Sequence, residues 1–342
     1  MEARILDSPS AACDEFVSRR PDSKLCHLWA WGRMVREACG HGNCYLVAQE
    51  GSDIRGVLPL VHVRSRLFGN RLISQALGNY GGALGSEEAV EVLYRAAVEL
   101  ARQRRCRTIE FRNVEPMPFE LHVRTDKVAM RLELLDDPDA MWKSFSKDSG
   151  VRKMVRKGRK NGISVVQGGK ELLDDFYRLY VIRMRQLGTP CYSMRIMRGF
   201  FECFPENAAL FLARLGEKTI AGKLMLRYKN QVEAFYSSSL IEYNKLGTNH
   251  LMHWTAMEHF CRQGVTSFDF GRSTAGSGSY EFKKKWGCQE IPLHWQYWTD
   301  EGQEMASLSP SNPKYQRRIE LWRKMPLWLT KLVGPVISRQ LP

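Results

Sequence analysis

Apolar residues in the first part of the chain recur first at helical and then at strand spacing. Residues 29–38 predict a helix, and the apolar runs 44–48 and 56–63 flank a polar turn, which predicts a hairpin of two strands. In residues 87–102 the spacing is helical again, and residues 108–111 predict a further strand. The first part of the chain is therefore expected to mix helix and sheet.

The second part repeats this outline after Asp136-Asp137-Pro138-Asp139, a run typical of a helix start. Antiparallel strands lead into a helix and one more strand, as in the first part, so we expect two lobes. No repeat is visible at the level of single residues. The predicted helices are 139–161, 171–187, 195–203 and 249–263, and the predicted strands are 163–167, three between 208 and 239, and 267–270.

Composition is consistent with a folded protein of two domains. The chain has 342 residues, of which 44% are hydrophobic and 26% charged, and Lys plus Arg (51) exceed Asp plus Glu (37) by 14. Such a charge attracts phosphates, nucleic acid or acidic lipid without choosing among them. The nine scattered cysteines form no C-x-x-C pair, which favours a reducing cytoplasm over a disulfide framework. The sequence shows no apolar leader and no run of 18 apolar residues, so we expect neither a signal peptide nor a membrane-spanning helix.

The segment most informative about chemistry runs from Phe268 to Gly287. Residues 268–273 predict a short buried strand, residues 276–279 a mobile Gly/Ser-rich loop, and residues 282–287 a cationic turn flanked by Phe and Trp. Such a turn is suited to holding an anion or a developing oxyanion. This layout favours transfer chemistry over a scaffold role.

Two other segments concentrate positive charge. Residues 143–160 hold eight basic residues against Asp148, and on a helix Arg152, Arg156, Arg159 and Lys160 share a face that can follow phosphates or remain simply solvated. Residues 312–342 interleave basic and apolar residues in short amphipathic helices. Such helices either lie at a membrane interface or pack against the second lobe.

Several single residues carry weaker signals. Gly247, just before a predicted helix, can let backbone amides approach a phosphate or can belong to an ordinary turn. Tyr236 can reach a cleft or pack in the core. Tyr80, with Gly81 and Gly82, can shape an acceptor pocket or form a plain turn.

Three histidines lie on the predicted helix 249–263: His250, His253 and His259. No nearby carboxylates complete a metal site, so we expect core or surface histidines and no bound metal.

These motifs resemble those of a known family. The entry Tyr243…Gly247…Leu251, residues 261–264, residues 269–273 and Phe282-Lys283…Trp286-Gly287 resemble the acyltransferase domain of Fem-type peptidoglycan aminoacyltransferases, which has the acetyltransferase (GNAT) fold. More narrowly, the whole chain is similar to FemAB-like proteins associated with exosortase (PEP-CTERM) and exopolysaccharide loci of Gram-negative bacteria. That similarity is carried by residues 56–60, 65–69, 80–82, 110–112 and 312–335.

The resemblance implies an α/β (α+β) protein with two tandem GNAT-like domains, at 1–135 and 136–305, and a basic amphipathic C-terminal arm at 306–342. It also implies attack by an amine on an activated acyl group, without a tightly bound cofactor. In Fem-type enzymes the donor is an aminoacyl-tRNA and the acceptor an anionic muropeptide precursor. Residues 244–249 lack the full Gln/Arg-x-x-Gly-x-Gly/Ala pattern that grips coenzyme A, which favours aminoacyl-tRNA over acyl-CoA.

The resemblance and the charge pattern together assign roles to residues. Lys283, in the Phe-Lys motif, is expected to stabilise the oxyanion, and Asp269 or a water to take the ammonium proton. Asp269 can instead cap the following loop or pair with Arg272. The residues expected to bind donor or acceptor are Arg272, Ser273, Tyr236, Gly247, Asn249, Lys284, Lys285, Arg152, Arg156 and Tyr80.

The resulting hypothesis is a Fem-like N-acyltransferase that acts on a cell-envelope or exopolysaccharide precursor. We expect it in the cytoplasm, with tRNA as a partner and with the arm touching the inner-membrane surface. Two alternatives remain open, both without catalysis: an RNA-binding protein, and an assembly factor for an envelope polysaccharide.

Overall fold

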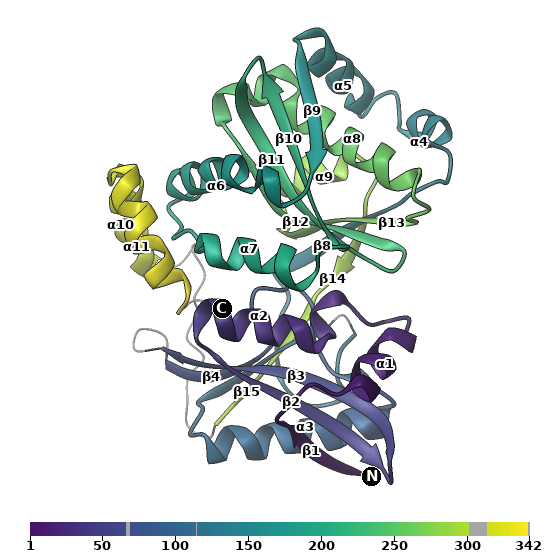
Figure 1. Cartoon of the computed structure of the whole chain (residues 1–342), viewed down its shortest axis with the longest axis vertical. Coiled ribbons are helices and arrows are strands. Elements are labelled where there is room, and N and C mark those ends of the chain that lie inside the picture. Colours follow the sequence, from purple (N-terminus) through teal and green to yellow (C-terminus); the bar gives the residue numbers. More distant parts are fainter. Residues whose placement is uncertain (66–68, 114, 301–312, 341–342) are drawn as a thin grey trace. The chain divides into compact units, whose positions relative to one another are not determined.

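The computed structural model describes residues 1–65, 69–113, 115–300 and 313–340 (Figure 1). Their contacts define two units: unit 1 comprises residues 1–125, 292–312 and 336–342, and unit 2 comprises residues 126–291 and 313–335. Arg66-Leu67-Phe68 of the family motif, the end of the predicted second domain (301–305) and the start of the predicted arm (306–312) lie outside the described residues.

Unit 1 is built around one sheet with the strand order β1-β2-β3-β4-β6-β15-β7, in which β5 also pairs with β3. The predicted hairpin is confirmed as the antiparallel pair β2 and β3. The strands are β1 (Glu2–Leu6), β2 (Gly42–Glu50), β3 (Asp53–Ser65), β4 (Gly69–Ser74), β5 (Leu84–Gly85), β6 (Thr108–Asn113), β7 (His122–Arg124) and β15 (His294–Thr299). The helices are α1 (Ala11–Arg19), the short 3-10 turn Leu25–His27, α2 (Trp29–Cys39) and α3 (Glu87–Gln103).

Helix α3 shows how local sequence sets the crossover of unit 1. The Ser86 side chain accepts a hydrogen bond from the Ala89 amide and so caps the first turn. Leu93, Ala97 and Leu100 repeat at helical spacing and are buried against the sheet. The chain returns from α3 into β6, which pairs in parallel with β4.

Unit 2 contains a second sheet, with the strand order β14-β8-β13-β12-β11-β10-β9. Its strands are β8 (Lys127–Glu133), β9 (Ile163–Gly168), β10 (Ala208–Leu215), β11 (Lys218–Tyr228), β12 (Gln231–Ser239), β13 (Ser267–Thr274) and β14 (Gln289–Pro292). Its helices are α4 (Pro138–Ser144), α5 (Val151–Lys160), α6 (Leu173–Leu187), α7 (Met194–Cys203), α8 (Thr248–Cys261) and α9 (Gly278–Lys284), with 3-10 turns at Lys170–Leu172 and Ile241–Leu246.

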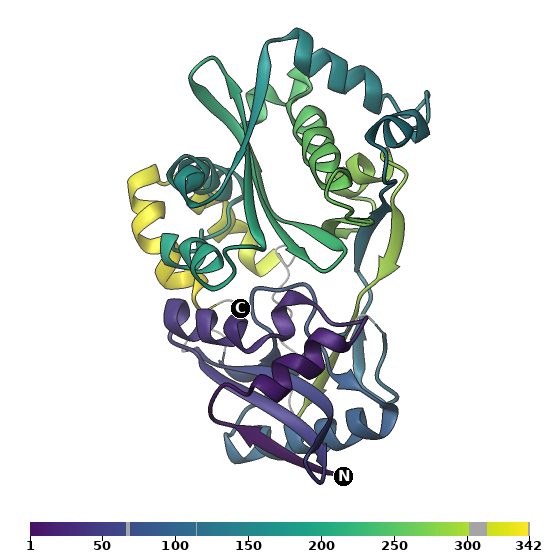
Figure 2. The ribbon, with the colours of Figure 1, turned by 45° about the vertical axis from the view of Figure 1, so that its right-hand side comes forward.

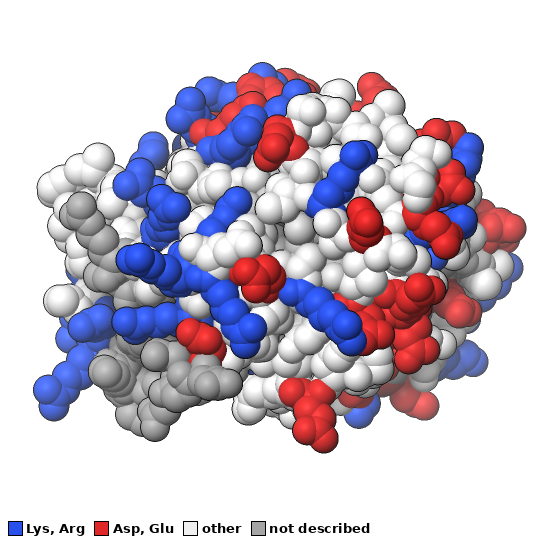
Figure 3. All heavy atoms as spheres, turned by 90° about the horizontal axis from the view of Figure 1, so that it is seen from below, with Lys and Arg blue, Asp and Glu red and all other residues white. Residues whose placement is uncertain are grey.

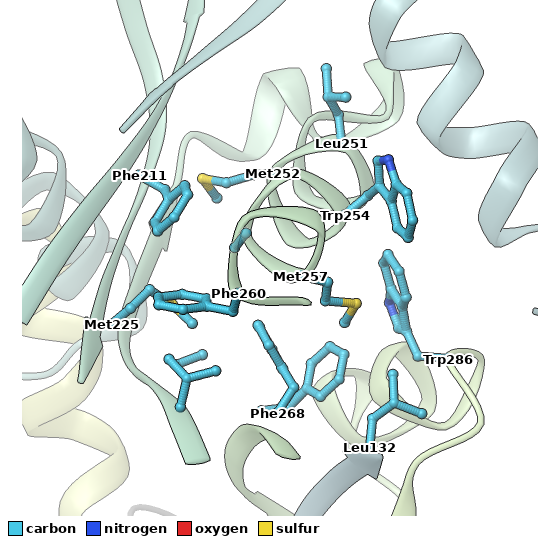
Figure 4. Packing of buried hydrophobic residues seen from close by; sticks show 14 of the residues in the cluster. Leu132, Phe211, Met225, Leu251, Met252, Trp254, Met257, Phe260, Phe268 and Trp286 are labelled. Carbon is cyan, nitrogen blue, oxygen red and sulfur yellow. The ribbon is translucent and has the colours of Figure 1, made fainter. Parts of the chain in front are cut away.

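The main core of unit 2 lies between its sheet and α8. Figure 2 shows α8 on one face of the sheet and α6 with α7 on the other. Met252, Met257 and Phe260 of α8 point toward Phe211 and Phe268 of the sheet (Figure 4), and all five side chains are buried. This packing fixes α8 against the sheet.

Two local predictions were wrong in unit 2. The predicted helix 139–161 is interrupted: α4 ends at Ser144, where Phe145 is extended, and α5 begins only after Gly150, which adopts φ +72°. The predicted mobile loop 276–279 instead starts helix α9, where the Ser277 hydroxyl accepts from the Tyr280 amide. The basic stretch that follows therefore begins on a helix.

The two sheets take strands from distant parts of the sequence. Strand β8, which precedes the helices of unit 2, pairs antiparallel with β13, and β15, which follows them, pairs antiparallel with β6 of unit 1. The units therefore differ from consecutive divisions at residues 135 and 305. Those domain ranges remain predictions.

The C-terminal arm contains α10 (Pro313–Lys324) and α11 (Leu327–Ser338). Within unit 2 it packs on the end of α6, where Arg185 donates to the Met325 carbonyl (3.3 Å) and a Cβ on Gly188 would lie 2.4 Å from Ile319. The packing alternative is therefore confirmed for this part. The arm nevertheless leaves Leu321, Trp328 and Leu332 about two-thirds exposed, at 65%, 67% and 67%.

Candidate active site

The sheet of unit 2 opens between two of its central strands. Strands β12 and β13 are paired in parallel at three positions, and the last pair is Glu233 with Asp269. Beyond it β12 continues to Ser239 along β11, and β13 continues to Thr274 along β8. The two strands therefore diverge beyond this pair and leave an opening in the ladder of the sheet.

A bulge in β13 marks the point of divergence. The register with β8 shifts between Asp269 and Arg272, and Gly271 has φ +74°. The buried Asp269 carboxylate accepts a hydrogen bond from the Gly271 amide at 2.7 Å. This hydrogen bond supports the alternative that Asp269 caps the following turn. Its role as proton acceptor remains a prediction.

Helix α9 brings Lys283 to this bulge. The Lys283 Nζ donates to the carbonyl oxygens of Gly271 (2.8 Å) and Arg272 (3.0 Å). Burial lowers the pKa of Lys283 to about 8, and the nearby Asp269 carboxylate partly opposes that shift. Lys283 is thus a half-buried cation whose charge is lost just above neutral pH.

Lys223 is a second lysine at the site, and the sequence reasoning missed it. It lies on β11, is only 2% exposed, and donates from Nζ to the exposed hydroxyl of Ser237 on β12 at 3.0 Å. Burial, followed by repulsion from Lys283, lowers the pKa of Lys223 to about 7. The signal in the sequence was one lysine in the middle of the apolar strand 220–226.

His253 of α8 completes the buried polar group. Its Nδ1 has no hydrogen-bond partner among the described residues. Burial, with Lys223 next in weight, holds the pKa of His253 well below its ordinary value, so the ring is neutral. Phe270 and Phe282 lie against the ring, at centroid distances of 4.7 and 5.4 Å. The site is thus positive, aromatic and largely shielded from water.

Other groups at the site are poor nucleophiles or metal ligands. Burial raises the pKa of Cys288 to about 12, so it is a thiol and not a thiolate at neutral pH. His250 stacks on Trp286 at a centroid distance of 5.9 Å, and burial lowers its pKa to about 4. Within the described residues no three His, Cys, Asp or Glu side chains are grouped to hold a metal ion.

Of the predicted binding residues, Asn249 and Ser273 lie near the divergence. The Asn249 amide donates to Ser239 at the end of β12 (3.3 Å), and buried Ser273 is 3.4 Å from the Ser279 hydroxyl. Arg272, Lys284 and Lys285 are exposed around the same turn. These residues border the site without filling it.

Tyr236 and Gly247 have contacts that explain them structurally. Tyr236 packs against the rings of Tyr180 and Phe200 on the side of α6 and α7, so it lies on the face opposite to Ser237. A Cβ on Gly247, which has φ +91°, would lie 2.3 Å from the Met154 carbonyl oxygen of α5. Gly247 therefore permits close packing of α5, and its donor-binding role stays a prediction.

The remaining predicted binding residues are Arg152 and Arg156 on helix α5 and Tyr80 in unit 1. Helix α5 buries Val151, Val155 and Gly158, leaves Arg152 half-buried and exposes Arg156, whose guanidinium is 5.8 Å from the Trp142 ring centroid. Tyr80 belongs to unit 1. Charge is unevenly spread over the surface, as the face in Figure 3 shows, with Lys and Arg gathered mainly on one side and Asp and Glu on the other.

Comparison with known proteins identifies the fold of these units. Residues 146–284 match the family model described as the acetyltransferase (GNAT) domain. The crystal structure of FemX is 16% identical with a TM-score of 0.66, and the match covers 93% of this chain and 99% of that chain. No curated protein matches the sequence.

Two other solved structures share the arrangement. The C-terminal domain of a putative lysylphosphatidylglycerol synthetase from Agrobacterium fabrum is 13% identical (TM-score 0.57, covering 84% of this chain and 90% of that one). A tandem GNAT protein from the clavulanic acid biosynthesis pathway is 14% identical (TM-score 0.52, covering 89% and 100%). The chain therefore has a tandem GNAT-like α/β fold with a C-terminal helical arm, and the opening between β12 and β13 lies within the residues that match the acetyltransferase (GNAT) model.

Proposed function

We propose that this protein is a Fem-like N-acyltransferase, which transfers an aminoacyl or acyl group to an amine at the opening between β12 and β13. The observation that supports this most strongly is a pair of lysines, half-buried Lys283 and buried Lys223, beside a gap between strands. One lysine is suited to carry charge and the other to be neutral near pH 7. Acyl transfer to an amine needs both functions.

In the proposed reaction, the neutral amine nitrogen of the acceptor attacks the carbonyl carbon of the donor. A carbon–nitrogen bond forms, negative charge develops on the carbonyl oxygen, and the bond from the carbonyl carbon to the leaving oxygen or sulfur then breaks. Protonated Lys283 stabilises the oxyanion. Neutral Lys223, reached through Ser237, accepts the proton that the acceptor nitrogen releases. This proton then passes to the leaving oxygen or sulfur, which departs as a hydroxyl or thiol.

Asp269 has a supporting role in this proposal. Its carboxylate holds the Gly271 amide and raises the pKa of Lys283 against the effect of burial. It thereby keeps Lys283 charged at neutral pH and fixes the bulge whose carbonyls hold the ammonium. We therefore propose Lys223, whose pKa of about 7 is more suitable, as the proton acceptor in place of Asp269.

The donor favoured here is an aminoacyl-tRNA. Basic residues on the outer face of α5, including Lys153, Arg156 and Lys157, are exposed and can contact a phosphate backbone. Gly247, which in a coenzyme A site would approach the pyrophosphate, is explained by its packing on α5. Both observations support tRNA over acyl-CoA.

The acceptor favoured here is an amine on a cell-envelope or exopolysaccharide precursor. The name of the Agrobacterium protein joins a lysyl group to an anionic lipid, and FemX shares the fold across nearly the whole chain. The motifs shared with FemAB-like proteins of exosortase (PEP-CTERM) loci add the exopolysaccharide setting to the proposal.

The test offers the purified protein charged tRNA and acyl-CoA in parallel, with an envelope extract as the acceptor. We expect a product that carries the acyl group from charged tRNA. Transfer from acyl-CoA alone would replace the proposed donor. Transfer from neither donor, with salt-sensitive RNA binding that survives Lys283→Ala, would favour the non-catalytic RNA-binding alternative that the exposed face of α5 supports.

Contact of the arm with the inner-membrane surface belongs to the same proposal. None of the helices in the described ranges has the length and apolar character to cross a bilayer. Trp328 and Leu332 lie one helical turn apart and are exposed, with Lys331 beside them. Flotation on vesicles with anionic lipid should decrease for the double variant Trp328→Ser/Leu332→Ser, and unchanged flotation would remove this contact.

The assembly-factor alternative makes the opposite prediction for function in cells. Deletion of the arm would then abolish function, while changes at Lys283 and Lys223 would not.

A further inference from the structure

Unit 1 contains a cavity at the open end of its own parallel strand pair. Strands β4 and β6 pair from Arg71 with Thr108 to Ile73 with Glu110, and the chain after each strand then lines a cavity of about 370 Å³. Residues 80–85 form one wall and residues 112, 113 and 115–118 another. The cavity thus occupies the place in unit 1 that the catalytic opening occupies in unit 2.

Arg112 is a fixed cation in the wall of this cavity. It is 5% exposed, and its Nε donates to Glu110 at 2.7 Å while Nη1 donates to the carbonyls of Gln75 and Gly78 at 3.3 and 2.6 Å. Its guanidinium carbon lies 4.6 Å from the Trp295 ring centroid. Nη2 has no acceptor among the described residues, so this edge of the guanidinium is available to a ligand.

The glycine segment opposite supplies backbone donors. Gly81 and Gly82 are buried in the wall, and neither amide donates to an acceptor in the part of the chain that the structure describes. Unsatisfied buried amides are costly, and an anionic oxygen in the cavity would satisfy them. Gly82 cannot be larger, because a Cβ there would lie 1.8 Å from the Asn113 side-chain oxygen.

His27 holds this segment in place without adding charge. Its Nδ1 accepts from the Lys24 amide at 2.9 Å, so its Nε2 carries the proton and donates to the Gly82 carbonyl at 3.1 Å. Burial lowers the pKa of His27 to about 4, which keeps the ring neutral. The cations at the cavity are therefore Arg112 and Lys24.

Acidic residues at the same cavity select the kind of anion. Asp22, Glu87 and Glu115 are exposed and line it together with the two cations, and Asp22 also pairs with Arg20 at 2.7 Å. Three carboxylates disfavour a polyphosphate, whereas a ligand with one carboxylate and an amino group is complementary to both signs. We propose that unit 1 binds a small zwitterionic molecule, with its carboxylate between Arg112 and the Gly81–Gly82 amides and its amino group toward the acidic residues.

The test uses the full chain labelled with ¹⁵N-glycine and titrated with glycylglycine, acetate or inorganic pyrophosphate. We expect saturable shifts of the Gly81 and Gly82 amide signals with glycylglycine, weaker binding of acetate, and no saturable shift with pyrophosphate. Tighter binding of pyrophosphate than of glycylglycine would overturn the ligand class. No saturable shift with any of the three would overturn the site.

Variants locate the binding energy. Arg112→Gln should weaken glycylglycine binding by about tenfold or more, because it removes a charge-assisted hydrogen bond. Lys24→Met changes a half-buried side chain and should weaken binding about threefold through a lost longer-range attraction. If Arg112→Gln does not fold, unchanged binding by Lys24→Met contradicts the proposal. Lys283→Met should bind normally, so this result is independent of acyl transfer.

Discussion

The two units place different chemistry at the same point of a common architecture. In both units a helix leads into a strand that pairs in parallel with an earlier strand at three positions: β6 with β4 in unit 1, and β13 with β12 in unit 2. The later strand contributes an acid to the last of these pairs, Glu110 in unit 1 and Asp269 in unit 2. A phenylalanine follows each acid, Phe111 and Phe270. Beyond that point the units differ in the cation that the acid supports.

In unit 1 the cation is an arginine bound directly by the acid. Arg112 pairs with Glu110 at 2.7 Å, and a guanidinium stays charged at any physiological pH. In unit 2 the cations are two lysines whose pKa values burial lowers to about 8 and about 7. A permanent charge suits binding, and a titrating amine suits proton transfer. The comparison is therefore consistent with the two proposals, ligand binding by unit 1 and acyl transfer by unit 2.

The largest expected effect is that of Lys283→Met on turnover. Removal of the only proposed oxyanion donor from a side chain should lower kcat by about 10²- to 10³-fold. The measurement is the initial rate of acyl transfer at saturating donor. Lys284→Met is the matched control, because Lys284 is the exposed neighbour on the same helix. Loss of its predicted donor contact should raise KM for the donor and leave most of the rate at saturating donor. Equal rates for both variants would remove Lys283 from the mechanism.

Lys223→Met should separate activity from stability. Loss of a general base is expected to lower kcat by about 10²-fold. The same change removes a buried amine with one hydrogen-bond partner, so the free energy of unfolding at pH 7 should rise. Rate measurements and urea denaturation test the two parts. A variant that is both less stable and inactive would indicate a structural role.

The rate should have a bell-shaped pH dependence. It rises through about pH 7 as Lys223 becomes neutral and falls above about pH 8 as Lys283 loses its proton. Lys223→Met should remove the rising limb and retain the falling one. A profile in which both limbs persist in this variant would exclude Lys223 as the proton acceptor.

The free energy of unfolding should depend on pH in a different way from the rate. Both folded lysine pKa values lie below the ordinary value of 10.5, so above pH 7 the unfolded chain retains protons that the folded chain has released. The contribution of these groups to the free energy of unfolding therefore increases from about pH 7 toward 10.5. The urea midpoint of unfolding should therefore keep rising above about pH 8, where the rate of acyl transfer falls. Lys223→Met should weaken the pH dependence of this midpoint.

The last prediction concerns Gly247 and has no direct bearing on the rate of the reaction. Gly247→Ala places a Cβ against the α5 backbone at a positive φ, which should cost about 1–3 kcal/mol for the overpacking and about 1–2 kcal/mol for the conformation. Gly264→Ala is the control, since it has φ +70° and open space, so only the second cost applies. Equal stabilities of the two variants would show that α5 packing does not explain Gly247.

Sequence reasoning predicted the elements best where one periodicity ran without interruption. Helix α3 and the hairpin of β2 and β3 were expected, because apolar spacing and turn residues are local signals. The pairing of β8 with β13 in unit 2 and of β15 with β6 in unit 1 was missed, because pairing across more than 100 residues leaves no local pattern. The break before α5 was missed because charged residues on both sides of Gly150 suit one long helix.

The site was predicted in part for the same reason. Lys283 and Asp269 stood in a recognisable motif, and the structure places them at one bulge. Lys223 was missed because only tertiary packing tells a buried lysine in an apolar strand from one that reaches solvent. For Tyr236 both a cleft position and core packing were open, and the period-two alternation of β12 turns it toward α6 and α7.

The central claim is that unit 2 holds two lysines that titrate near neutral pH, and it can be measured without a substrate. NMR of ¹⁵N-lysine side chains, with Lys223→Met and Lys283→Met to assign the signals, follows each amine as the pH is raised. We predict two signals with midpoints at about pH 7 and about pH 8. Two lysines that remain protonated up to about pH 10, the ordinary range for this side chain, would contradict the account.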